Sequence, residues 1–276
     1  MSQSYFESSR KVGLWLCKSL YLFLILKILF LWPILSDIIE FTSYKVGPGI
    51  RQLVFLPLVL TKSYFNEEWF LGLFIALLLV SLLIRTNYIS GILIFWFSLS
   101  LSKLIFSVSN GSDLILNIFL FISIFVVTNP NFNSKKLLQF QIIISNAALL
   151  LGQIQIALIY FLSGYDKLTS LAWQTGAAMN SITNLTFFQN PFLSLELTEF
   201  QCILLCWLII LFELGFSFLI WFNKFRVPML TLGVMFHLGI VLFLGLADFG
   251  IVMILCYTLF MPIQKESVKK LVIANG

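Results

Sequence analysis

Ionisable side chains inside long apolar runs are the residues of this sequence that could do chemistry. They are Lys27, Lys103, Glu213 and His237, joined by Lys167 at the end of such a run. An ionisable group inside a membrane costs several kcal/mol unless it is paired or hydrated, so each of the five is a candidate functional residue. Glutamate, histidine and lysine side chains take up and release protons, so the chemistry open to this set is proton transfer.

Glu213 and His237 lie near the middle of consecutive apolar runs that would form antiparallel neighbouring helices. Their side chains could therefore meet at a similar depth. In one interpretation, Glu213 pairs with His237 or with a lysine such as Lys103, and the pair holds two helices in register. In the other, Glu213 and His237 handle a proton beside a substrate. Lys27 has a long stem that can reach an interface, which favours a structural role.

Lys167 closes the segment YFLSGYDKL over residues 160–168, and Trp173 follows six residues later. A lysine between an apolar run and an aqueous loop either extends its ammonium group to the interface or, once desolvated, loses its proton readily. The adjacent Asp166 favours the charged form. Gly164 would let a neighbouring helix or a ligand approach the backbone closely. Both interpretations of Lys167 remain open at this point.

The composition defines the class of protein that must position these residues. Of 276 residues, 60% are hydrophobic and 11% are charged, whereas about 25% charged residues are usual in a soluble domain. This excess of hydrophobic over charged residues excludes a cytosolic enzyme and a disordered chain. The basic residues are scattered along the sequence, which excludes a nucleic-acid binder. The four cysteines lack paired CxxC spacing, so neither a metal site nor a disulfide framework is expected, and Cys202 and Cys206 suit helix packing. The lipid bilayer is the expected partner.

Apolar runs of the length needed to cross a membrane, about 20 residues, recur along the sequence. The last run contains a polar break, Ala247-Asp248-Phe249-Gly250, and is split in two there. We therefore predict an all-α integral membrane protein of about eight transmembrane helices in one bundle. The runs are Val12–Leu35, Trp69–Ile84, Tyr88–Val108, Leu114–Thr128, Leu137–Ser163, Gln201–Phe222 and Val227–Pro262.

The distribution of lysine and arginine predicts the orientation of these helices. With the N-terminus inside, ten basic residues fall on the inner side: Arg10, Lys11, Arg85, Lys135, Lys136, Lys224, Arg226, Lys265, Lys269 and Lys270. Four fall on the outer side: Lys45, Arg51, Lys62 and Lys167. The positive-inside rule then favours both termini inside.

No polar stretch is long enough to form a second soluble domain, so residues 1–276 are predicted to form a single membrane domain. Two outer loops are long. Ser36–Glu68 contains the apolar stretch Leu53–Leu60, which is too short to span and is predicted to be interfacial or re-entrant. Gly164–Phe200 is predicted to fold onto the outer membrane face, with a short helix that starts at Thr169 or Ser170 and runs to about Met179.

Four blocks of residues, in order, resemble the HTTM family, the membrane domain shared with vitamin K-dependent gamma-glutamyl carboxylase. They cover much of residues 153–253, with a weaker similarity at Ser109–Leu114. The blocks are IYFLSGYDKL (159–168) with WQTG (173–176), FELGFS (212–217) with FNKFR (222–226), Phe236-His237, and LADFGIVM (246–253).

The resemblance implies roles for the candidate residues. In the carboxylase, the lysine that matches Lys167 is regarded as the base that deprotonates vitamin K hydroquinone, on the lumenal side. Lys167 is accordingly expected to be the catalytic base, with Glu213 and His237 as supporting catalytic residues. Tyr160, Gly164 and Trp173 are expected to contact a quinol cofactor. The distribution of lysine and arginine places Lys167 on the outer side of the membrane, which agrees with the lumenal site of the carboxylase.

The sequence departs from the carboxylase pattern at three places. Asp166-Lys167 stands where the carboxylase has two lysines, and Ser112 is the best counterpart of a histidine in the carboxylase. Only 14 residues follow Pro262, in place of the large lumenal region that docks the substrate. A partner protein would therefore have to present any peptide substrate, as expected for stand-alone bacterial members of the family, one of which matures a secreted peptide toxin with partner proteins.

The leading functional expectation is that the protein modifies or matures an exported peptide with a lipid-soluble quinol at the outer face of a bacterial cytoplasmic membrane. The alternative is a non-catalytic membrane subunit whose polar residues lock helices together and whose outer loops bind partner proteins in an envelope complex. A transporter is less well supported, because the sequence has no inverted repeat or paired broken helices.

Overall fold

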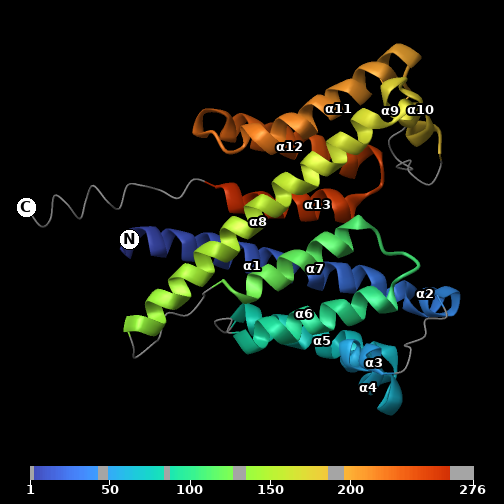
Figure 1. Cartoon of the computed structure of the whole chain (residues 1–276). Coiled ribbons are helices and arrows are strands. Elements are labelled where there is room, and N and C mark those ends of the chain that lie inside the picture. Colours follow the sequence, from blue (N-terminus) through green and yellow to red (C-terminus); the bar gives the residue numbers. More distant parts are fainter. Residues whose placement is uncertain (1–2, 43–48, 84–87, 127–134, 186–195, 262–276) are drawn as a thin grey trace, which may run out of the picture. The chain divides into compact units, whose positions relative to one another are not determined.

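In the computed structural model, residues 3–42, 49–83, 88–126, 135–185 and 196–261 are described, and across these ranges the chain is helical, with no β-strand. The predicted all-α class is confirmed. Contacts divide the chain into two compact units (Figure 1). Unit 1 comprises Met1–Leu150 and Met261–Gly276, and unit 2 comprises Leu151–Phe260. The predicted organisation as one bundle stays a prediction.

Unit 1 is built around α1 (Gln3–Leu31), which is followed by η1 (Trp32–Ile34) and α2 (Leu35–Thr42). The buried face of α1 is an apolar stripe at four-residue spacing, the spacing that keeps side chains on one helix face: Leu16, Leu20, Leu24 and Ile28. α1 packs against α5 (Glu67–Leu83) and α7 (Gly111–Ile124).

The remaining elements of unit 1 complete this packing. α6 (Tyr88–Leu104) contacts α5 and α7. The stretch Leu53–Leu60, predicted to be interfacial or re-entrant, lies across the end of α3 (Ile50–Val54) and the start of α4 (Leu56–Tyr64). α4 has Pro57 in its first turn, where a missing backbone N–H costs nothing, and it packs on α5 and α6. Phe70 and Phe74 of α5 are fully buried, as is Phe119 of α7.

α8 (Lys135–Thr169) is a 35-residue helix that contains the boundary between the units at Leu150 and Leu151. It continues beyond the predicted end at Ser163 to Thr169, because no proline interrupts it. The Thr169 hydroxyl donates to the carbonyl oxygens of Tyr165 and Asp166 in its last turn. The first residues of the predicted loop Gly164–Phe200 are therefore helical.

The short helix expected after this point is present as two pieces, α9 (Leu171–Gln174) and α10 (Ala177–Asn184), and Ser170 occupies the N-cap position of α9. Gly176, with φ +80°, begins α10, and a Cβ there would lie 2.7 Å from the backbone nitrogen of Ile203. Glycine thus lets α10 pack closely on α11.

α11 (Glu199–Leu219), α12 (Asn223–Phe243) and α13 (Ala247–Cys256) form the rest of unit 2 with η3 (Tyr257–Phe260). Thr198 and Gln201 cap the start of α11 reciprocally. The last apolar run is broken as predicted, but at residues 244–246, where Gly245 has φ +64° and the chain turns back so that α13 packs on α12, whereas the expected residues of the break, 247–250, form the start of α13. Cys202 and Cys206 are reduced and pack with Met179, as expected from their spacing.

Within the described ranges, four helical segments are long and apolar enough to cross a membrane: Arg10–Glu40, Lys136–Thr169, Glu199–Leu219 and Asn223–Phe243. Shorter apolar helices occupy three further predicted spans, at Tyr88–Leu104, Gly111–Ile124 and Ala247–Phe260. The chain therefore has the character of a helical membrane protein. The count of eight spans and their orientation stay predictions.

Candidate functional site

One face of α8 carries the site in unit 2. Tyr160, Ser163, Gly164 and Lys167 follow one another at three- and four-residue spacing, which places them on one stripe of a helix. α11 presents Glu213 to this stripe. A Cβ on Gly164 would lie 3.1 Å from the Cβ of Glu213, closer than is usual for such contacts, so the absence of a side chain lets the two helices approach closely here.

Lys167 and Glu213 form a buried ion pair. The ammonium Nζ lies 2.8 Å from Oε2 and 3.0 Å from Oε1 of Glu213, and it also donates to the Ser163 hydroxyl at 2.5 Å. The side chains are 17% and 6% exposed, respectively. An ammonium group has three N–H donors, so Lys167 has a partner for each of them. The Trp173 ring, centred 5.0 Å from Nζ, covers another side of the charge.

A second polar cluster consists of Tyr160, His237 and Tyr257. The Tyr160 hydroxyl lies 2.6 Å from Nε2 of His237 and is also hydrogen-bonded to the Tyr257 hydroxyl. His237 is only 1% exposed, and its Nδ1 has no hydrogen-bond partner within the described part of the chain. An unpartnered buried ring nitrogen is unusual, because it forfeits a hydrogen bond that water would supply.

Glycines allow α12, α13 and η3 to hold this cluster together. A Cβ on Gly233 of α12 would overlap the Tyr257 ring, and one on Gly250 of α13 would lie 2.7 Å from the His237 carbonyl oxygen. Aromatic rings enclose the cluster: Phe216 lies 4.2 Å from Tyr160 and 5.6 Å from Tyr257 between ring centroids. The surroundings are therefore apolar, which strengthens the polar interactions inside.

The two polar clusters line one cavity of about 160 Å³. Lys167, Glu213 and Ser163 contribute to its wall, together with Tyr160, His237 and Trp173, and the other lining residues are apolar. A cavity of roughly 150 Å³ in another protein core accommodates a benzene molecule, so this one is of the size of a single aromatic ring. The arrangement can hold such a ring between a carboxylate and a histidine.

The structure thus brings five of the six predicted site residues to one cavity, while Gly164 lies outside its lining and packs against Glu213 and Leu214. Sequence reasoning missed Ser163 and Tyr257. The signal for Ser163 was present, since it lies one helical turn before Lys167, whereas nothing distinguishes Tyr257 within its apolar run. A lysine partner for Glu213 was among the interpretations, but the lysine is Lys167 and not Lys103. Glu213 pairs with Lys167, while the single histidine bonds to Tyr160.

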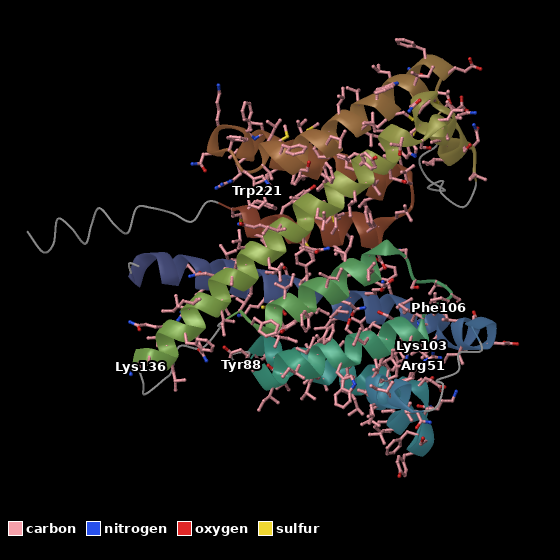
Figure 2. The ribbon with its side chains drawn as sticks, in the orientation of Figure 1. Arg51, Tyr88, Lys103, Phe106, Lys136 and Trp221 are labelled. Carbon is pink, nitrogen blue, oxygen red and sulfur yellow. The ribbon has the colours of Figure 1, made fainter. Side chains whose placement is uncertain are left out.

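The remaining ionisable candidates lie in unit 1. Lys27 of α1 pairs with Asp113 of α7 at 2.6 Å, and both side chains are buried, in keeping with the structural role expected for Lys27. In the sequence, Asp113 immediately precedes the predicted span Leu114–Thr128. Its other oxygen accepts the backbone N–H of Asn110, which caps α7. The Lys103 ammonium lies over the ring of Phe106, where α6 ends (Figure 2).

No family model, curated protein or solved structure matches this chain. The resemblance to the HTTM family therefore stays a prediction from the sequence.

Proposed function

We propose that this protein is a polytopic membrane enzyme of HTTM type that binds the ring of a lipid-soluble quinol and uses it to modify or mature an exported peptide. The supporting observation is the cavity that the Lys167–Glu213 ion pair and His237 line together, with Nδ1 of His237 lacking a partner among the described residues. A hydroquinone ring carries hydroxyl groups at opposite ends. One hydroxyl can donate to Glu213 while the other donates to or accepts from Nδ1, depending on the histidine tautomer.

Proton transfer in this proposal uses the ion pair as a unit. The Glu213 carboxylate accepts the proton as the quinol O–H bond breaks, and the phenolate that forms faces the Lys167 ammonium. Lys167 itself can be the base only after it passes a proton to Glu213, because it is an ammonium, without a free lone pair, whose N–H groups are donated to the two carboxylate oxygens of Glu213 and to the Ser163 hydroxyl. Whether Glu213 or Lys167 takes the proton from the quinol, the products are the same: Glu213 is protonated, Lys167 is an ammonium, and the negative charge is on the quinol oxygen.

The proposed membrane arrangement has eight spans with both termini inside, in a bacterial cytoplasmic membrane. The shorter helices α5 and α6, of 17 residues each, would rise about 26 Å at 1.5 Å per residue, close to the hydrocarbon thickness. This orientation would open the Lys167 end of α8 to the outside, where an exported peptide could reach it. A partner protein would present that peptide.

A chromogenic phenol tests the proton transfer directly. 4-Nitrophenol has a single ring, and its anion absorbs visible light. We expect purified protein to bind it and ionise it at a pH at which the free probe is protonated. Glu213→Gln should bind the probe without ionising it, whereas Glu199→Gln, which changes an exposed glutamate on the same helix, should behave as the wild type. Equal ionisation by Glu213→Gln would exclude Glu213 as the proton acceptor.

A non-catalytic membrane subunit is the second candidate, and one observation favours it. The ammonium of Lys167 is fully paired and links α8 to α11, as a purely structural lock would. Lys167→Arg separates a subunit from an enzyme in which Lys167 is the base, because arginine keeps the charge but cannot act as a base. In that enzyme, this variant should fold and lose the mass shift of a copurifying exported peptide. In a subunit it should be silent, while Glu213→Ala should cause misassembly with partner proteins.

A further inference from the structure

The outward face of α1 carries two lysines and a tryptophan in a membrane-spanning segment. Lys11, Trp15, Lys18 and Leu22 recur at four-, three- and four-residue spacing, so they form one stripe. Trp15 is 70% exposed, and both lysines are exposed, whereas Leu16 and Leu20 on the opposite face are fully buried. This stripe therefore faces the surroundings of unit 1 instead of its core.

The stripe forms one wall of a groove, and Leu82 of α5 contributes to the other side. The groove has a volume of about 500 Å³, within the range of roughly 300–1,000 Å³ typical of ligand sites. Its lining is apolar apart from Ser19 and the two lysines, with Leu14, Leu22 and Leu82 among the apolar side chains. An occupant must therefore combine a long apolar part with an anionic group.

The charges of Lys11 and Lys18 are uncompensated in the part of the chain that the structure describes, where neither ammonium has a hydrogen bond or an ion pair. Lys18 lies eight residues after Arg10, the first residue of the segment Arg10–Glu40, or about 12 Å along the helix. A lysine at that depth is expected to extend its stem toward the end of the segment, and so toward Lys11, to avoid the hydrocarbon. The ammonium groups of Lys11 and Lys18 then lie near each other at the depth of the lipid head groups.

We propose that this groove binds an anionic phospholipid. Its phosphate lies between Lys11 and Lys18, and one acyl chain runs along Leu14, Leu22 and Leu82. The Cα atoms of the two lysines are about 10.5 Å apart along the helix, a separation that two lysine stems can bridge to reach one phosphate. A zwitterionic lipid fits less well, because its choline cation would add a third positive charge. The site lies within unit 1 and does not depend on the quinol proposal.

Quenching of Trp15 fluorescence tests this proposal. The protein is reconstituted in vesicles that contain either phosphatidylglycerol or phosphatidylcholine with brominated acyl chains, at equal mole fractions. The difference between the wild type and Trp15→Phe isolates the Trp15 signal from that of the other six tryptophans. A lysine near the membrane surface contributes about a fivefold preference for anionic lipid, so we expect clearly stronger quenching by phosphatidylglycerol.

Single and double variants assign the preference to the two lysines. Lys11→Gln and Lys18→Gln should each weaken it about fivefold, and the double variant should abolish it, while Lys224→Gln, which alters an exposed lysine in unit 2, should leave it unchanged. Equal quenching of wild-type Trp15 by the two lipids would overturn the proposal without any variant. A preference that persists in the double variant would also overturn it.

Discussion

The Lys167 ammonium on α8 and the Glu213 carboxylate on α11 meet at 2.8 and 3.0 Å although 46 residues separate them in the chain. Both side chains are largely withdrawn from water. Each charge is therefore compensated mainly by the other, with the Ser163 hydroxyl as a further partner of Lys167. Loss of either partner leaves a buried charge without compensation.

The first prediction concerns this mutual dependence. Glu213→Leu or Lys167→Met alone should lower the free energy of unfolding by about 3–5 kcal/mol, the usual cost of breaking a buried pair. The double variant should lose much less than the sum, since neither charge remains. Thermal and denaturant unfolding in mild detergent measure this double-mutant cycle. Additive losses would show that the two side chains are not coupled.

The second prediction concerns the close contact of α8 with α11. Gly164→Ala should destabilise the protein by about 1–3 kcal/mol, because the new Cβ would lie 3.0 Å from Cγ of Leu214 and 3.1 Å from Cβ of Glu213. Gly239→Ala is the matched control: a Cβ there meets no atom within 4 Å. That change should be neutral or slightly stabilising, because alanine favours a helix over glycine by up to about 1 kcal/mol. Similar unfolding temperatures for both variants would argue against tight packing at Gly164.

The positions of most helices, and one face of the site, follow from the sequence. Long apolar runs predict helices because a helix satisfies its own backbone hydrogen bonds in an apolar environment, and Gly245 lies close to the one break inferred inside a run. The spacing of Tyr160, Gly164 and Lys167 on a single helix already places them on one side of it.

The pairing of charges between helices could not be predicted in the same way. The two buried ion pairs, Lys27–Asp113 and Lys167–Glu213, join residues far apart in sequence, and spacing along a helix does not say which helix lies opposite. Asp166 is adjacent to Lys167 and seemed its natural counter-ion, yet its carboxylate is exposed and Glu213 takes that place. Asp113 lies just outside the apolar run Leu114–Thr128, but in the structure it belongs to the first turn of α7, where its carboxylate both caps the helix and meets Lys27.

The third prediction follows from that second pair. Asp113→Asn removes a buried negative charge that contacts the Lys27 ammonium at 2.6 Å. Loss of this carboxylate beside the buried Lys27 ammonium should cost about 3–5 kcal/mol of stability. Asp166→Asn is the control, because exposed charges outside such pairs change stability by no more than about 0.5 kcal/mol. Unfolding of both variants in the same detergent compares them, and an Asp113→Asn protein as stable as Asp166→Asn would contradict the structural importance of this pair.

The fourth prediction tests the proposed orientation in the membrane. Leu185→Cys places a thiol at an exposed position after α10, and the four native cysteines are buried, so they should give little background labelling. With the N-terminus inside, residue 185 faces outward, and a membrane-impermeant maleimide should label the variant in intact cells. A variant that lacks the four native cysteines and carries Leu185→Cys controls for slow reaction of the native thiols. Labelling only after the inner face is opened would reverse the orientation and would place Lys167 on the side away from an exported peptide.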